Sequence, residues 1–195
     1  MLRFLAVLGA CIVAASGPSP AGAQQSPPPP ANALLMRMAE YLAKAQSFSV
    51  TMDVSFDVVQ PSGQKIEFDE TRKVTLSRPD KFRIDVQEAD GDEQQIRFDG
   101  QDLVLFSPKE KVFGKLARPG NADEAIYYFV SEMQTRLPLS LLLVTPIAEE
   151  LQKRVTEISL VEQATVDGRL TDHLAARTDD LDFQVWIAQG DVPVP

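Results

Sequence analysis

The chain has 195 residues and is 44% hydrophobic, which is the composition of a folded domain rather than of a disordered chain. Its 19 basic and 28 acidic side chains give a net charge of −9, which argues against a nucleic-acid partner because nucleic-acid affinity comes mainly from basic groups on phosphates. The single cysteine and single histidine exclude two-cysteine redox sites and multi-histidine metal sites, so we expect no metal or other cofactor.

The N-terminus has the pattern of a secretory signal peptide. Arg3 supplies a positive n-region, residues 4–15 form an apolar h-region, and Ala21-Gly22-Ala23 makes a small-x-small cleavage site. We therefore predict that residues 1–23 are removed on export.

A second interpretation of this segment is a lipoprotein signal. Leu8-Gly9-Ala10-Cys11 is similar to a bacterial lipobox, whose cysteine becomes the lipidated N-terminus of the mature protein. The apolar run before Cys11 is only about half the usual h-region, so we prefer cleavage after residue 23.

The mature chain is expected to hold one domain behind a tether. Loss of residues 1–23, in which Arg3 is the one charged side chain, leaves 172 residues without cysteine and a net charge of −10. Residues 24–32 are polar and rich in proline, which predicts an extended linker. The remaining residues 33–195 are long enough to bury a core of their own.

The domain opens with a predicted helix and a predicted hairpin. Asn32 is a plausible N-cap for a helix over residues 33–46, whose apolar positions recur at helical spacing. Strict alternation of apolar and polar residues over 48–58 predicts a long strand with one wet face. A turn at 60–63 returns the chain into a second strand over 64–76.

The rest of the chain predicts more strands, then helices, then strands again. Four short strands centre on residues 82–86, 96–98, 103–106 and 112–116. Helices follow over 122–137 and 148–153, with an apolar stretch at 139–147 between them, and three strands cover 155–165, 170–178 and 181–188. This order predicts an α+β fold in which a strongly curved antiparallel sheet has its open side covered by helices.

Six motifs occur in chain order, and together they carry a family resemblance. They are Leu34, Leu35, Met38, Tyr41 and Leu42 with Phe48 after them; Arg78-Pro-Asp-Lys-Phe-Arg83; Phe98-Asp-Gly100; Pro138-Leu-x-x-Leu-Leu143; His173-Leu-Ala-Ala-Arg177; and Asp182-Phe-Gln-Val-Trp-Ile187. The chain over residues 33–195 resembles a family of predicted periplasmic proteins of unknown function, similar in fold to the lipoprotein carriers LolA and LolB and to the mycobacterial lipid carrier LppX.

The resemblance implies a periplasmic protein with a LolA-like fold. That fold is an incomplete β-barrel around a helix, with a helical lid over an apolar cavity. Family members continue past a segment like residues 190–195 into further strands, so we expect the natural domain to extend beyond Pro195.

The residues show no catalytic constellation, and we expect a protein that is not an enzyme. No serine lies in a Gly-x-Ser-x-Gly turn, and His173 falls on a predicted strand. The acidic turn at 90–93 lacks the ligand spacing of a calcium loop. On its strand, His173 shares a face with Thr171, Ala175 and Arg177, so a His/Arg contact with a ligand or a neighbouring strand stays open.

The apolar strand faces provide the candidate binding site. If the sheet curves around a cavity, ten residues line its concave side: Phe48, Val50, Met52, Val54, Phe56, Phe68, Phe82, Ile84, Phe98 and Leu105. Unbroken alternation puts Glu70 and Arg72 on this face as well. Inside, the two charges must satisfy each other or reach a polar ligand head, which makes Arg72 a candidate anchor; a bulge or edge position would instead turn them outward.

Leu139, Leu142 and Leu143 are the candidate lid, although the same stretch could form fixed core. We expect a non-catalytic binding protein that carries a lipid or a lipoprotein acyl group and makes transient contact with a membrane or an envelope protein. A cavity lined by the ten residues favours this carrier. A filled core with an exposed apolar groove favours an envelope-stress sensor or scaffold, and a hydrolase would need a nucleophile and an acid beside His173.

Overall fold

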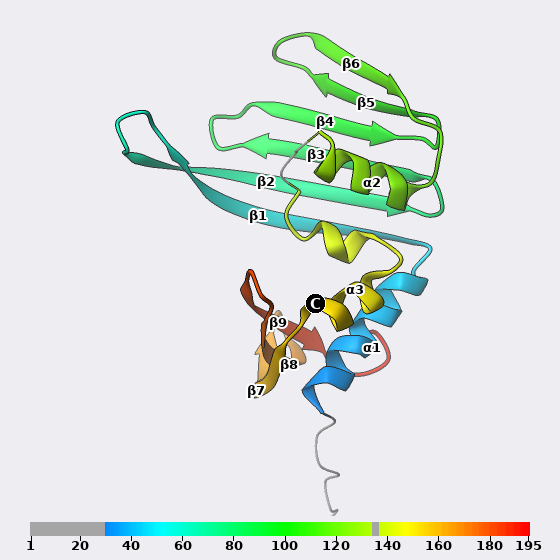
Figure 1. The fold of residues 1–195 in the computed structure, drawn as a ribbon, viewed down its shortest axis with the longest axis vertical. Coiled ribbons are helices and arrows are strands. Elements are labelled where there is room, and N and C mark those ends of the chain that lie inside the picture. Colours follow the sequence, from blue (N-terminus) through cyan, green and yellow to red (C-terminus); the bar gives the residue numbers. More distant parts are fainter. Residues whose placement is uncertain (1–29, 134–136) are drawn as a thin grey trace, which may run out of the picture.

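The computed structural model describes residues 30–133 and 137–195, so the predicted leader and Cys11 lie outside the described residues (Figure 1). Helix α1 (Ala31–Lys44) leads into six strands: β1 (Ser47–Val59), β2 (Lys65–Ser77), β3 (Lys81–Glu88), β4 (Glu93–Phe98), β5 (Asp102–Ser107) and β6 (Val112–Ala117). Then come α2 (Ala122–Ser131), the 3-10 turn η1 (Ser140–Leu143), α3 (Ile147–Arg154), β7 (Glu157–Val166), β8 (Arg169–Arg177) and β9 (Asp182–Ala188). None of the helices in the described ranges is long and apolar enough to cross a membrane.

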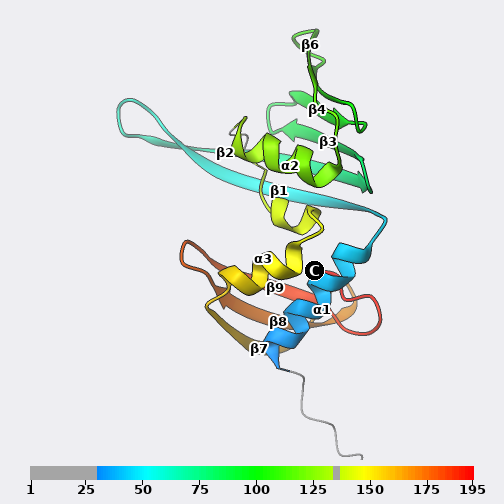
Figure 2. The same ribbon diagram turned by 45° about the vertical axis from the view of Figure 1, so that its right-hand side comes forward.

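The described strands form two antiparallel sheets that do not close into a barrel. The large sheet has the order β1-β2-β3-β4-β5-β6 and the small sheet has the order β7-β8-β9. The predicted α+β class, the antiparallel pairing and the incomplete barrel are confirmed. The strands divide into two sheets because η1 and α3 carry the chain from β6 to the side of α1, where β7 begins (Figures 1 and 2).

Helix α2 covers one face of the large sheet (Figure 1). Its start is set by a capping box: the Asn121 side chain accepts from the Glu124 backbone N–H at 2.9 Å, and the Glu124 carboxylate accepts from the Asn121 N–H at 3.2 Å. The helix ends at Ser131, whereas the sequence predicted a helix to residue 137. Residues 134–136 of that predicted helix lie outside the described residues. Ile126 and Phe129 from α2 join the strands in one buried cluster.

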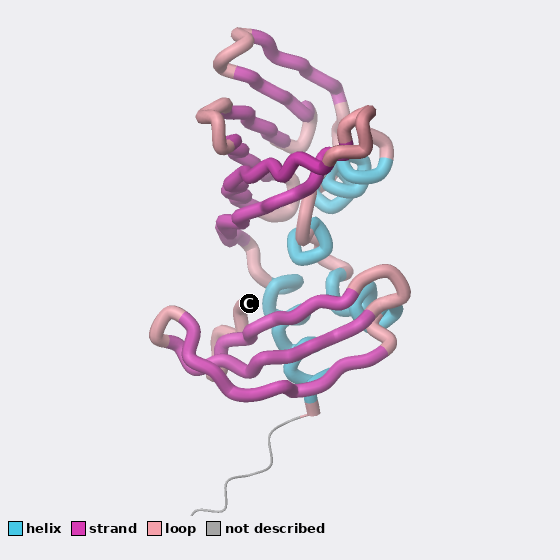
Figure 3. The backbone as a smooth tube through the Cα atoms, turned by 90° about the vertical axis from the view of Figure 1, so that its left-hand side faces the viewer, coloured by secondary structure: helices cyan, strands magenta, loops and turns pink. Residues whose placement is uncertain are grey.

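Helices α1 and α3 pack against one face of the small sheet (Figures 2 and 3). The apolar stripe predicted on the first helix is buried there, with Leu35 and Met38 each 1% exposed. The helix begins at Ala31 rather than after Asn32, because Pro30 takes the N-cap position with a φ of −53° and no side-chain cap. These elements form a second core, separate from the core under α2.

The two cores meet at η1, and Arg78 is the side chain that joins the surrounding elements. Leu141 of η1 packs against both clusters. The Arg78 guanidinium donates to the carbonyl oxygens of Ala45 and Leu143 at 3.1 Å each, to Thr145 Oγ1 at 3.1 Å and to Asp123 Oδ1 at 3.3 Å. This side chain, 9% exposed, therefore links the turn between β2 and β3 to α1, α2 and η1.

Replacing Arg78 by lysine should destabilise the fold strongly. A single ammonium cannot serve four acceptors that lie in separate directions, and the buried carbonyls left without a donor add to the loss, so we expect a decrease of about 3 kcal/mol in the free energy of unfolding. Urea denaturation measures it. The matched control is Arg83→Lys, because Arg83 pairs with Asp85 on the surface with its side chain 47% exposed and should lose under about 1 kcal/mol. Equal losses in the two variants would contradict this role of Arg78.

Two of the six motifs meet at a close approach between loops. Gly100 has a φ of +90°, and a Cβ added to it would lie 2.8 Å from Asp80 Oδ2. Beside it, Asp99 Oδ1 accepts from the backbone N–H groups of Asp102 at 2.9 Å and Gln101 at 3.0 Å, and these bonds hold the pKa of Asp99 below its ordinary value. The stability from this turn is present above the ordinary carboxyl pKa and is lost as pH falls through the lowered one.

Gly100→Ala should lower the stability of the fold more than Gly63→Ala, another substitution at a glycine of positive φ. The added methyl group meets both an unfavourable φ and the Asp80 side chain, so we expect a loss of about 1–3 kcal/mol. Gly63→Ala is the control, because Gly63 has a φ of +84° but nothing within 4 Å of an added Cβ. Thermal unfolding of the two variants should show a larger drop for Gly100→Ala; a drop of the same size would argue that Asp80 gives way freely.

Candidate functional site on the inner face of the large sheet

All ten predicted lining residues lie on one face of the large sheet, the face that α2 covers. Directly opposed residues of antiparallel strands share a face, and the register shows two such rows across the sheet. One row is Phe48, Leu76, Phe82, Phe98, Leu103 and Leu116; the next is Val50, Val74, Ile84, Ile96, Leu105 and Gly114. We call this surface the inner face.

The centre of the inner face is filled rather than hollow. Met52, Phe82, Ile84 and Phe98 are between 1% and 7% exposed and belong to one buried cluster with side chains of α2. The rings of Phe82 and Phe98 lie 5.5 Å apart. Of the ten residues, these four therefore serve as core beneath α2, and Phe48, Val50 and Val54 are partly buried and pack against this core.

The inner face continues along the β1–β2 hairpin, where two large apolar side chains are exposed. Strand β3 pairs with β2 only from Glu70 onward, so the end of the hairpin extends past the neighbouring strands (Figures 1 and 2). There the rings of Phe56 and Phe68 stack with centroids 6.0 Å apart, and Phe68 is 46% exposed. Together with Ile66, which is 39% exposed, these residues form an apolar surface that we call the hairpin platform.

The opposite end of the inner face is also exposed. Leu105, the last of the ten predicted residues, is 41% exposed on β5, and its neighbour Leu116 on β6 is 40% exposed. The inner face is thus a filled core under α2 with apolar surface left open at both ends.

Glu70 and Arg72 lie on the inner face between the hairpin platform and the core. The β1–β2 register runs without a bulge, which rules out the outward alternative. Arg72 donates from Nε and Nη2 to Glu70 Oε1, at 2.7 Å and 2.5 Å, and the two side chains are 10% and 8% exposed. The two charges are therefore paired with each other where the core under α2 meets the exposed apolar surface of the hairpin.

Replacing one member of the Glu70–Arg72 pair should lower the stability of the fold more than replacing both. Arg72→Met leaves the Glu70 carboxylate buried without its partner, and we expect a loss of about 3 kcal/mol, whereas Arg72→Met combined with Glu70→Leu should recover most of it. Chemical denaturation of both single variants and the double variant gives the coupling energy. A double variant as unstable as the sum of the singles would contradict the buried pairing.

The candidate lid residues lie at the joint between the cores. Leu143 is buried in the core under α2, Leu142 packs on the core of the small sheet, and Leu139 is 58% exposed. Arg78 holds the Leu143 carbonyl, and both carboxylate oxygens of Asp123 accept from the Thr145 N–H at 3.1 Å. This anchoring favours the fixed-core alternative, and the element that covers the inner face is α2.

His173 is buried in a cluster on the face of the small sheet opposite α1. Its ring stacks on Trp186 with centroids 4.1 Å apart, its Nε2 lies 2.7 Å from Gln184 Oε1, and its Nδ1 lies 3.5 Å from Glu162 Oε1. None of these described partners is a hydroxyl or thiol nucleophile. Sequence alternation placed His173 and Arg177 together but missed Trp186 and Gln184, because their proximity depends on the β8–β9 register.

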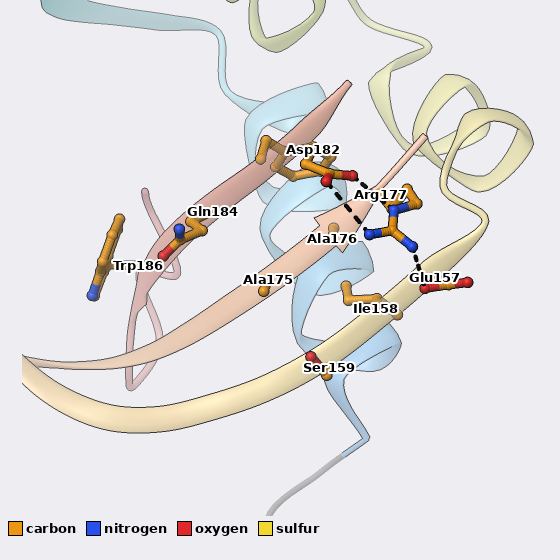
Figure 4. A pocket seen from close by; sticks show the side chains of 10 residues that line it. Glu157, Ile158, Ser159, Ala175, Ala176, Arg177, Asp182, Gln184 and Trp186 are labelled. Atoms are coloured by element: carbon orange, nitrogen blue, oxygen red, sulfur yellow. Dashed lines mark hydrogen bonds and ion pairs between the residues drawn. The ribbon is translucent and has the colours of Figure 1, made fainter. Parts of the chain in front are cut away.

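An open groove of about 730 Å³ follows this face of the small sheet (Figure 4). Ser159, Ala175 and Gln184 lie across its floor, and Trp186 stands at one end. At the other end Arg177 binds Glu157 at 3.1 Å and Asp182 at 2.8 Å, and its hydrogen bond holds the pKa of Asp182 below the ordinary value. The charges along the groove are thus already paired with one another.

This geometry defines the class of protein: an α+β domain with an incomplete barrel, in which a helix covers one apolar face of the large sheet. Residues 31–195 match the model of the family described as predicted periplasmic protein (DUF2092), and the chain belongs to that family. The predicted resemblance to a periplasmic family of unknown function is thereby confirmed. No curated protein matches the chain.

Two solved structures are similar to parts of the chain. A chain of the Pseudomonas aeruginosa MucA/MucB complex is 18% identical with a TM-score of 0.38; the match covers 82% of this chain and 47% of that one, so the present chain spans about half its length. A DUF1329 family protein from Desulfovibrio piger ATCC 29098 is 12% identical with a TM-score of 0.31, and the match covers 82% of this chain and 69% of that one. The family match, rather than these likenesses, places the chain among predicted periplasmic proteins.

Proposed function

We propose that the protein is a non-catalytic periplasmic binding protein that holds an acyl chain of a lipid or lipoprotein on the hairpin platform. The observation that carries this proposal is the continuation of the inner face along the hairpin, where Phe68 is 46% exposed and Ile66 is 39% exposed beside a closed core. Apolar surface of this kind gains roughly 25 cal/mol per Å² when a ligand covers it.

The charges beside the platform suit a ligand with an apolar tail and a polar head. Arg72 lies four residues from Phe68 on the same face of β2 and is bonded to Glu70, which lies between them. An ester or phosphate group at this boundary would take part in the pair as a third member, which is the anchor role proposed for Arg72. If Arg72→Ala leaves the lipid affinity unchanged, the anchor role is excluded.

A non-catalytic role agrees with the surroundings of His173. A hydrolase needs a nucleophile within hydrogen-bond reach of its base, and the described partners of this imidazole are an amide, a carboxylate and an indole. Binding without chemistry needs apolar surface only, and the hairpin platform supplies it.

The filled core under α2 favours a second candidate, a sensor or scaffold that binds a protein on the same platform. Four of the ten predicted lining residues are packed against α2 and offer no room for a tail while α2 stays in place. A partner protein would need only the exposed part of the inner face. The two candidates therefore share a surface and differ in its occupant.

Phe68→Glu tests the platform directly. A carboxylate in place of the exposed ring should weaken acyl binding by at least about tenfold, because burying a phenylalanine contributes roughly 1.5–3 kcal/mol. Mass spectrometry of organic extracts from natively purified protein, with titration of a fluorescent fatty acid, measures the loss. Leu170→Glu is the control, since Leu170 is 50% exposed on the small sheet.

The outcomes separate the two candidates. Lipid in the wild-type extract and its loss in Phe68→Glu alone support the carrier. A wild-type extract without lipid, and no binding of the fluorescent fatty acid, contradicts the carrier and leaves the scaffold.

A further inference from the structure

Strand β6 is an edge strand with apolar residues on both of its faces. All six of its residues are exposed, and among the described residues it pairs only with β5. Phe113 is 73% exposed and stands beside Phe106 on the outer face, while Val112 is 53% exposed on the inner face. Such an edge is a template for another strand.

The features that usually protect an edge are weak here. The strand contains no proline, and its register with β5 runs without a bulge. Its one charged residue, Lys115, has its Nζ drawn back over β5 to Asp102 Oδ2 at 2.7 Å. The charge therefore points away from the open edge.

The backbone orientation identifies which groups are open. The Arg118 N–H donates to the Gln101 carbonyl at 2.7 Å, so the even-numbered residues of β6 direct their backbone groups toward β5. Phe113, Lys115 and Ala117 then direct their N–H and C=O groups away from the sheet. These are the groups that a new strand would pair with.

We propose that β6 pairs with β6 of a second copy of this chain, antiparallel and centred on Gly114, so that the two large sheets become one continuous sheet. The two-fold axis is perpendicular to the sheet, and the arrangement closes as a dimer. In this register Phe113 forms its hydrogen bonds with Lys115 of the second copy, and Val112 lies opposite Leu116 of the second copy.

The lysines select this register over its neighbours. Moving the centre to Phe113 sets Lys111 opposite Lys115 of the second copy, and moving it to Lys115 sets the two Lys115 side chains opposite each other. Like charges directly opposite are destabilising. Shifts by a single residue set inner-face positions against outer-face positions, which the pleat forbids. Among the adjacent registers only the centre at Gly114 avoids these conflicts, so β6 is complementary to itself in one register, which favours a second copy of this chain as the occupant.

Cysteine cross-linking tests both the partner and the register. At the centre, opposed α-carbons of a pair without hydrogen bonds lie about 4.5 Å apart, within the range of a disulfide. Nothing lies within 4 Å of a Cβ added at Gly114, so Gly114→Cys fits the fold. We expect Gly114→Cys to form a linked dimer on mild oxidation. Val112→Cys should not, because the two copies of Val112 lie roughly 13 Å apart.

Charge at the edge provides a second test that does not depend on cross-linking. Phe113→Lys puts like charges opposite each other twice across the axis, and the dimer dissociation constant should rise by about tenfold or more in sedimentation equilibrium. Phe106→Lys is the control, because Phe106 shares the outer face but lies on β5. Circular dichroism checks that each variant is folded.

Three results would overturn the proposal. They are a wild-type protein that stays monomeric at the highest soluble concentration, cross-linking of Val112→Cys as efficient as that of Gly114→Cys, and equal weakening by Phe113→Lys and Phe106→Lys. The wild-type protein without the predicted leader has no cysteine, so it sets the background for cross-linking.

Discussion

The arrangement of the whole molecule depends on one buried cation, Arg78. Its guanidinium reaches two backbone carbonyls, a hydroxyl and a carboxylate that come from three separate stretches of the chain. A planar fork of donors can serve several acceptors at once, which no other side chain does in so small a volume. The contact sets where α2 begins relative to the large sheet and where η1 leaves it.

From that joint follows the division of the apolar surface. With η1 held by Arg78 and by Asp123, Leu141 can pack on both cores and the chain can cross to the small sheet. Helix α2 is held over the centre of the inner face by the same contacts. The ends of the inner face, at the hairpin platform and at β5–β6, stay open because α2 has only ten residues.

The Glu70–Arg72 pair and the apolar residues around it share one physical constraint. A charge on the inner face is tolerated only where another charge meets it, and the pair lies where cover by α2 gives way to solvent. A boundary of this type suits a ligand or partner that is apolar on one side and polar on the other.

Local rules were sufficient for much of this protein. Alternation over residues 48–58 placed Phe48 to Phe56 on one face, because strand side chains repeat every two residues whatever lies beyond the strand. The spacing of Leu34, Leu35 and Met38 predicted the apolar stripe of α1, because residues three and four apart share one face of a helix. The α+β class and the run of antiparallel strands also followed from the order of the elements.

Other features depend on contacts between distant residues, and no local rule contains them. Whether Glu70 and Arg72 faced inward required the unbroken pairing of β2 with β1, and the partners of His173 required the β8–β9 register. The filled centre of the inner face required the position of α2, and the two sheets required the path through η1. The sequence by itself determined which residues share a face; only the tertiary structure decided which faces are covered, because cover comes from elements far away in the chain.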